Sequence, residues 1–235
     1  MGREPAYEIA PGVWRIPVMT DDAINAFAFV ADDGQVTLLD AGLPYTRHRV
    51  RRGLTHLGSD VSEVTQVVAT HAHNDHAGGL AYVVRCSGAP LVAHEADRAY
   101  LERGRVPPIG PQTRGAWIWE LIGHYPKVTV TRTVTDAEAI DGGLRAFHTP
   151  GHTPGHTSWL HEPSGTLITG DAVHFYKGQV RIGIGLYCHD LALNDRSAER
   201  LGTLDYDAVG FTHGPEIRRQ GRDAIRAFLA GRPPG

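Results

Sequence analysis

Short apolar segments bounded by Gly, Pro, Asn and Asp recur along the whole chain. They are rich in β-branched and aromatic residues, which predicts strands. In the first half of the chain these segments occupy 12–18, 25–31, 35–42, 64–70 and 90–94. In the second half they occupy 127–134, 144–150, 157–162, 166–173 and 208–214. The sequence Asp32-Asp33-Gly34 separates two of the early segments and predicts a hairpin turn.

Apolar residues at helical spacing lie between several of these predicted strands. In segment 44–58, Val50, Leu54 and Leu57 fall on one face of a helix, and Gly58 follows as a stop signal. The other segments expected to be helical are 79–86, 95–103, 194–204 and a last one within 218–230. Clustered prolines and glycines between Gly104 and Gly115 exclude regular structure there and predict a loop that lies over another part of the molecule.

The order of these elements predicts an α/β fold. Strands with interspersed helices occur in both halves of the chain, which is typical of a sandwich built by duplication. No internal sequence repeat is strong enough to prove the duplication. Because no linker divides the chain, a single domain over residues 1–235 is expected.

Composition and charge restrict the possible partners. Hydrophobic residues make up 41% of the chain and charged residues 21%, which is ordinary for a folded globular protein. A net charge of −3 offers no overall basic surface, so we expect no nucleic-acid partner. No apolar run is long enough to span a bilayer, and no membrane partner is expected. Cys86 and Cys188 either pair or remain thiols, and without a secretory signal we expect a cytoplasmic protein.

Metal-ligating side chains are concentrated where the strand at 64–70 ends. His71, His73, Asp75 and His76 fall within six residues, in the stretch "THAHNDHAGG". Imidazole nitrogens suit zinc and similar divalent ions, and carboxylate oxygens can complete such a site or bridge two ions. Residues two apart in an extended segment point the same way, so His71 and His73 can share an ion. The cluster therefore predicts a metal site.

Further candidate ligands follow other predicted strands. His148, His152 and His156 lie in "FHTPGHTPGH", Asp171 ends "LITGD", and His213 ends "VGFTH". Each stands where an apolar run gives way to Gly, Pro or Thr, and loops held at the ends of strands are common places for functional side chains.

Taken together, "THAHNDHAGG", "TPGHTPGH", "TGD" and "THGP" resemble the motifs of the metallo-β-lactamase fold superfamily, in particular its dinuclear hydrolases. The resemblance extends from "LLDAG" to His213. It implies a four-layer αβ/βα sandwich with the metals between the sheets at one edge. It further implies one ion held by His71, His73 and His152, a second held by Asp75, His76 and His213, and Asp171 as the bridge. His148 and His156 are then expected to be supporting residues, and Asp40 is either a hydrogen-bond acceptor for a ligand histidine or a turn residue.

Two divalent ions about 3.5–4 Å apart can share a water molecule and lower its pKa toward neutrality, which provides a hydroxide nucleophile. We expect zinc, with iron or manganese as alternatives. Asp75 is expected to be catalytic as well as a ligand, because its carboxylate can accept a hydrogen bond from that hydroxide and orient it.

The resemblance leaves several substrate classes open. No flavin domain, β-lactamase cysteine or large basic nuclease insertion is present, and the extra helical domain of glyoxalase II is missing. We therefore expect a small-molecule lactone or ester as substrate, with a thioester as one alternative. A mononuclear iron enzyme similar to persulfide dioxygenases is the redox alternative. A metal-binding sensor without turnover is not favoured, because all seven ligand positions are filled.

His174 is the second expected catalytic residue. Related N-acyl homoserine lactonases often carry a substrate-binding tyrosine three residues after the bridging aspartate, which is the position of His174, although Tyr176 is an alternative. Residues expected to line a pocket or, equally, to seal the core or a homodimer interface are Trp117, Trp119, Phe175, Tyr176, Ile182, Ile184, Leu186 and Tyr187.

Overall fold

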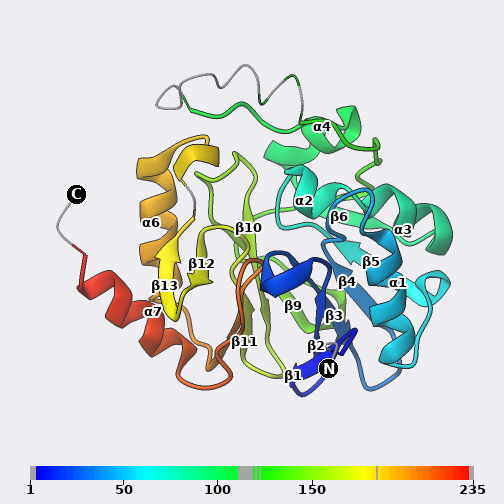
Figure 1. The fold of residues 1–235 in the computed structure, drawn as a ribbon, viewed down its shortest axis with the longest axis horizontal. Coiled ribbons are helices and arrows are strands. Elements are labelled where there is room, and N and C mark those ends of the chain that lie inside the picture. Colours follow the sequence, from blue (N-terminus) through cyan, green and yellow to red (C-terminus); the bar gives the residue numbers. More distant parts are fainter. Residues whose placement is uncertain (1–3, 111–118, 120, 122, 184, 233–235) are drawn as a thin grey trace.

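The N-terminal half of the chain forms a seven-stranded sheet with its strands in sequence order (Figure 1). The structure is a computed structural model and describes residues 4–110, 119, 121, 123–183 and 185–232. The first four strands pair antiparallel, and the last three join in parallel. These strands are β1 (Tyr7–Ala10), β2 (Val13–Pro17), β3 (Asn25–Val30), β4 (Val36–Leu39), β5 (Val64–Val68), β6 (Leu91–His94) and β7 (Arg132–Val134).

Parallel pairing requires crossover connections, and helices provide them on one side of this sheet. Helix α1 (Arg47–His56) joins β4 to β5, while α2 (Asn74–Ala77) and α3 (Leu80–Ser87) lie between β5 and β6. Helix α4 (Glu95–Arg103) follows β6 and has the bounds that the sequence predicted. The short helix α2 was not predicted as a separate element.

A second sheet of five strands comes from the C-terminal half, in the order β14-β11-β10-β9-β8. Helices α6 (Leu191–Leu201) and α7 (Gly221–Ala230) cover its outer face (Figure 1). Its strands are β8 (Ala139–Ile140), β9 (Leu144–His148), β10 (Thr157–His161), β11 (Thr166–Ile168) and β14 (Ala208–Gly210). A separate hairpin is formed by β12 (Val173–Tyr176) and β13 (Gln179–Ile182).

Some predicted boundaries were wrong. Segment 166–173 is not one strand, because the chain leaves the sheet after Ile168 and turns at Gly170, whose φ of 56° lies in the left-handed region. The strand expected at 127–134 begins only at Arg132. Helix α6 begins at Leu191 rather than at 194, because the Asp190 side chain accepts a hydrogen bond from the Leu193 amide and caps it.

Alternation of side chains along the strands divides the interior into three apolar layers. On β3, Ala26 and Ala28 face the core under the N-terminal helices, whereas Phe27 and Phe29 enter the core between the sheets. On β10, Trp159 enters the core between the sheets and Leu160 faces the core under α6 and α7. Both faces of β3 are buried, and its sequence is apolar from Ala26 to Val30. Three layers of core between four layers of structure confirm the predicted αβ/βα sandwich.

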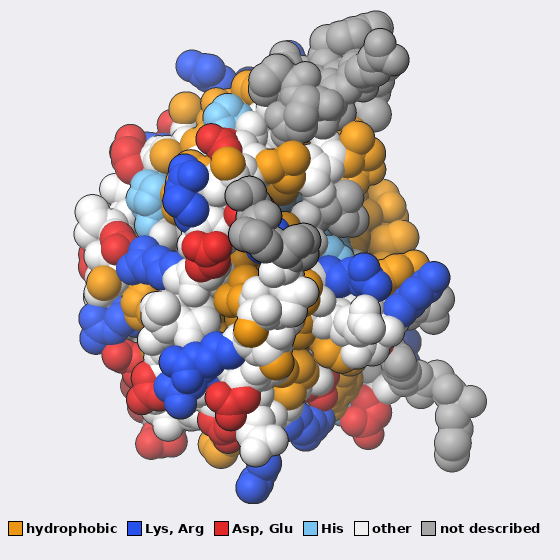
Figure 2. All heavy atoms as spheres, turned by 90° about the vertical axis from the view of Figure 1, so that its left-hand side faces the viewer, with side chains coloured by type: hydrophobic (Ala, Val, Ile, Leu, Met, Phe, Trp, Pro, Cys, Tyr) orange, Lys and Arg blue, Asp and Glu red, His pale blue; other side chains and the backbone are white. Residues whose placement is uncertain are grey.

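Two further features concern the surface and the cysteines. Charged side chains of both signs are interspersed with apolar ones on the face that carries α7 and β13 (Figure 2). Among the described residues, no helix is long and apolar enough to cross a bilayer. Cys86 is exposed and Cys188 is buried, and the two cysteines do not form a disulfide.

A buried arginine joins the two halves of the molecule. The Arg15 side chain is 1% exposed and donates to Asp22 at 2.6 Å, to Asn25 at 3.0 Å and to Glu216 at 2.9 Å. Asn25 in turn donates to the backbone carbonyls of Phe211 and Gly214, on either side of His213. Strands β2 and β3 thereby hold the loop that follows β14.

We expect Arg15→Leu to lower the free energy of unfolding by about 3–5 kcal/mol, because it removes the buried cation that pairs with the carboxylates of Asp22 and Glu216. Urea unfolding followed by circular dichroism measures the loss. The matched control is Arg98→Leu, which removes a solvent-exposed ion pair with Glu102 and should leave the unfolding midpoint nearly unchanged. Equal midpoints for the two variants would contradict a structural role for the Arg15 network.

Candidate metal centre

The structure brings all seven predicted ligand residues together at one edge of the two sheets. They come from different strand ends, as the sequence motifs indicated. His71 and His73 follow β5, Asp75 and His76 lie on α2, His152 follows β9, Asp171 follows β11, and His213 follows β14. Three overlapping groups of these side chains have their ligand atoms within 4.8 Å of one another.

One of these groups consists of His71, His73 and His152. The Nε2 atom of His152 lies 2.9 Å from Nδ1 of His73. The Nε2 atom of His71 is buried and has no hydrogen-bond partner among the described residues. Burying a nitrogen without a hydrogen-bond partner costs free energy. The unpaired Nε2 of His71 therefore indicates that this group binds a ligand.

A second group consists of Asp75, His76 and His213. Nε2 of His76 lies 3.3 Å from Nε2 of His213, and Oδ2 of Asp75 lies 3.6 Å and 3.5 Å from these two nitrogens. Ligands about 2.0–2.2 Å from a tetrahedral ion lie roughly 3.3–3.6 Å from one another. The spacing of the second group therefore fits one tetrahedral ion.

Asp171 lies between the two groups. Its Oδ2 is 3.3 Å from Nε2 of His152 in the first group and 3.1 Å from Nε2 of His213 in the second. Its other oxygen lies 3.5 Å from Nε2 of His76 and accepts a hydrogen bond of 2.7 Å from Thr212. The carboxylate is thus close to ligand atoms of both groups.

Asp40 orients one histidine of each group. Its Oδ2 lies 3.0 Å from Nδ1 of His76 and accepts a 2.6 Å hydrogen bond from the Thr70 hydroxyl. The same hydroxyl lies 2.9 Å from Nδ1 of His71 and can accept a hydrogen bond from it. Both imidazoles then present Nε2 to the cluster. Of the two roles left open for Asp40, the structure supports the hydrogen-bond acceptor.

The outer nitrogens of two other ligand histidines also have partners. Nδ1 of His213 donates to the backbone carbonyl of Ala23. Nδ1 of His152 lies 3.5 Å from the sulfur of Cys188. These contacts leave Nε2 of both rings facing the cluster.

Asp97 was missed by the sequence reasoning. Its buried carboxylate accepts hydrogen bonds from the Ala72 amide at 2.9 Å, the Thr153 hydroxyl at 2.7 Å and the Gly155 amide at 2.6 Å. It therefore fastens the segment of His71 and His73 to the loop of His152. An aspartate in the first turn of a predicted helix looks like an ordinary N-terminal residue, and no local signal distinguished it.

His156 contacts Asp171 and His148 contacts the loop that carries His152, and their expected supporting role stays a prediction. Nδ1 of His156 is 2.9 Å from the Thr149 hydroxyl, and its Nε2 accepts a 2.8 Å hydrogen bond from the Asp171 amide. His148 stacks on His94 at 3.7 Å between ring centroids and lies 2.9 Å from the carbonyl of Pro154.

The electrostatic environment differs between the two groups. Burial lowers the pKa of His71 and His152 well below the usual value and that of His73 to about 4, so these imidazoles are neutral with free lone pairs. Burial also disfavours charge on His213, but the carboxylates of Asp171 and Asp75 outweigh it and raise its pKa to about 9. Two carboxylates thus make this end of the cluster favourable to positive charge.

The cluster opens into a cavity of about 330 Å³ with apolar walls. Trp119 and Tyr187 line it as predicted, and their rings lie 4.7 Å apart. The other lining residues are Met19, Ile24, Leu43, His73, Asn74, Asp75, His152, Asp171 and His213. Trp117 and Ile184 lie outside the described residues.

The remaining predicted pocket residues lie elsewhere. Phe175 and Ile182 pack against the core under α6 and α7, and Leu186 is exposed. His174, on β12, is half-buried and lines a neighbouring cavity together with Tyr176, rather than the cavity of the ligand atoms. Its catalytic role stays a prediction.

Comparison with known proteins agrees with this geometry. The family model of the metallo-beta-lactamase superfamily matches residues 19–213. The uncharacterized protein YobT of Bacillus subtilis (strain 168) is 34% identical over 160 residues, which cover 66% of this chain and 64% of YobT. The probable metallo-hydrolase YybB of the same organism is 24% identical over 204 residues, covering 86% of this chain and 83% of YybB.

Solved structures lead to the same family. A HARLDQ-motif mutant of the metallo-beta-lactamase from Cronobacter sakazakii superposes with a TM-score of 0.70 at 27% identity and covers 88% of this chain and 79% of its own. Since the family model spans most of the chain and the ligand residues of its motifs meet in one cluster, the chain belongs to the metallo-β-lactamase superfamily.

Proposed function

We propose that this protein is a dinuclear metal-dependent hydrolase that opens a lactone or ester of a small acyl substrate. The observation that carries the proposal is the pair of three-residue ligand groups on either side of Asp171. The name of YybB, a probable metallo-hydrolase, is consistent with it.

The residues present fit two divalent ions. His71, His73 and His152 would hold one, Asp75, His76 and His213 would hold the other, and Asp171 would contact both. Nitrogen and carboxylate ligands without a thiolate favour zinc, with iron or manganese as alternatives. When bound, such ions lower the pKa of a coordinated water and polarise a carbonyl group.

The side chains of the protein would position the attacking water and the substrate and would supply charge. Asp75 is partly exposed to the cavity, and its carboxylate can accept a hydrogen bond from the attacking water and hold it near the substrate carbonyl. Met19, Trp119 and Tyr187 line the cavity and would offer apolar contact to the substrate. Asp40, Asp97 and His156 keep the ligand side chains and Asp171 in place.

A lactone or ester is proposed ahead of the alternatives because the cavity is small and apolar. A thioester would fit the same donor set. A mononuclear iron site, as in persulfide dioxygenases, would use only two histidines and one aspartate and leave the other donors without a function.

Metal analysis tests the central claim. The purified protein should contain close to two equivalents of zinc or a similar ion, because each group of ligands can bind one. Chelation should abolish hydrolysis of a 4-nitrophenyl ester, and added zinc should restore it. A single tightly bound iron, with oxygen consumed when a persulfide is supplied, would contradict the proposal.

Two substitutions should lower kcat/KM by different amounts. Asp75→Ala removes a ligand and the acceptor for the attacking water, so we expect kcat/KM to fall by more than about a hundredfold. His156→Gln can still accept the hydrogen bond from the Asp171 amide and should cost about tenfold or less. Both variants are compared at matched metal content and with the circular dichroism of the unmodified protein. Losses of equal size would mean that Asp75 has no special role.

A further inference from the structure

A second cavity lies on the other side of His213. Its volume is about 680 Å³, within the range of roughly 300–1,000 Å³ that is usual for small-molecule sites. Among the described residues, His213 is common to the walls of this cavity and of the cavity that holds the ligand atoms. The two cavities therefore adjoin at His213.

The lining of the second cavity is mostly apolar or neutral, and apart from His213, which faces the Asp75 and Asp171 carboxylates, it has two ionic side chains. Ala23, Phe175, Tyr176 and Pro215 are among its residues. The carboxylate of Asp22 is neutralised by Arg15 at 2.6 Å. The ammonium of Lys177 is exposed, and no carboxylate of the described residues lies within 4.0 Å of it. The cavity therefore carries one uncompensated positive charge.

The hairpin conformation fixes the position of Lys177. Lys177 and Gly178 form the two-residue turn between β12 and β13, with φ angles of 49° and 79°. Both angles lie in the left-handed region that such turns require, although a lysine is an unusual choice there. The ammonium lies 5.2 Å from the centroid of the Tyr176 ring, a cation–π distance.

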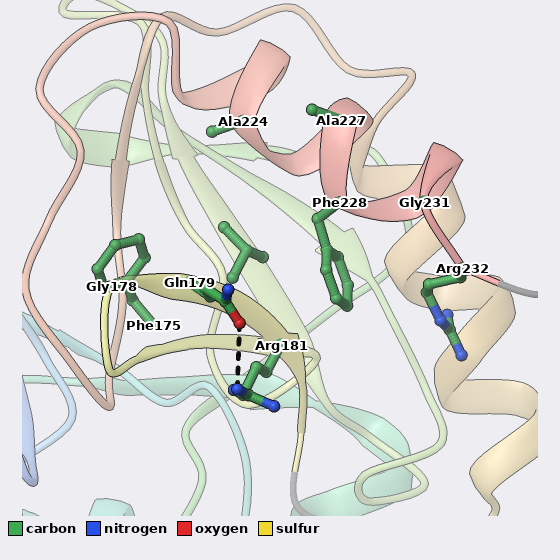
Figure 3. A pocket seen from close by; sticks show the side chains of 10 residues that line it. Phe175, Gly178, Gln179, Arg181, Ala224, Ala227, Phe228, Gly231 and Arg232 are labelled. Atoms are coloured by element: carbon green, nitrogen blue, oxygen red, sulfur yellow. Dashed lines mark hydrogen bonds between the residues drawn. The ribbon is translucent and has the colours of Figure 1, made fainter.

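Helix α7 supports the hairpin from behind. Residues of both elements line a third cavity of about 520 Å³, and Phe228 points from α7 toward the hairpin (Figure 3). Arg181 lies on this side and donates to Gln179 at 3.1 Å (Figure 3). Arg181 lines this third cavity, whereas Lys177 lines the cavity beside His213.

We propose that the second cavity binds the distal part of the substrate and that Lys177 pairs with a carboxylate on it. The inference rests on the proposed hydrolase function and narrows the substrate class to esters or lactones that carry an acidic group beyond a short apolar spacer. Lys177 would determine specificity and take no part in bond breaking.

A matched pair of substrates tests this inference. The mono-4-nitrophenyl ester of glutaric acid and 4-nitrophenyl pentanoate have acyl chains of equal length, and only the first ends in a carboxylate. The protein loaded with zinc should favour the acidic ester by about three- to fivefold in kcat/KM, mainly through KM, which is the size expected of a solvent-accessible ion pair. The preference should shrink in high salt.

Lysine variants show whether Lys177 causes the preference for the acidic ester. Lys177→Gln should remove the preference and Lys177→Arg should keep it. Lys127→Gln changes the only other lysine of the chain, outside the second cavity, and should leave the preference intact. Hydrolysis of both esters at equal rates by the unmodified protein, or a preference that survives Lys177→Gln, would overturn the inference.

Direct binding separates this inference from the proposed function. Glutarate should bind the zinc-loaded protein more tightly than pentanoate in calorimetry, and Lys177→Gln should abolish the difference. If neither ester is hydrolysed but this difference is seen, the hydrolase proposal fails and the anion site stands. If both esters are hydrolysed and the two acids bind equally, only the anion site fails.

Discussion

A buried imidazole is best oriented as a metal ligand when its outer nitrogen has a hydrogen-bond partner and its inner nitrogen stays free. The cluster is built around this requirement. Asp40 contacts His76 directly and reaches His71 through the Thr70 hydroxyl, and the carbonyl of Ala23 accepts from His213. One carboxylate therefore orients a histidine of each ligand group, so the two groups depend on each other.

The same requirement explains why the site lies where the two sheets meet. Side chains at the ends of β5, β9, β11 and β14 approach one another only if both sheets hold a fixed relative position. Trp159 fills the core between the sheets and donates to the carbonyl of Ala69 at 3.1 Å, two residues before His71. The Thr157 amide donates to the carbonyl of Thr70 at 2.8 Å. The packing between the sheets therefore helps to fix the position of the segment that carries His71 and His73.

His213 occupies a particular place in this arrangement. It is a candidate ligand, its loop is held by the Arg15 network, and its ring separates the two cavities. A substrate that extends past this ring would contact residues of the β12–β13 hairpin, which lies outside both main sheets. Substrate selection can then vary with the hairpin while the ligand cluster, which is anchored in the sheets, stays unchanged.

By itself, the sequence indicated an α/β sandwich, and its resemblance to the metallo-β-lactamase superfamily implied the four-layer class and the seven candidate ligands. The first inference depends on the period of apolar residues, and the resemblance depends on the histidine and aspartate motifs at strand ends. Only the tertiary structure decided the roles of Asp97 and Arg15 and the cavity that His174 lines. Asp97 joins Ala72 to Gly155, and Arg15 joins Asp22 to Glu216, across long separations in sequence. The role of a buried charge depends on which partners reach it, and folding alone brings those partners together.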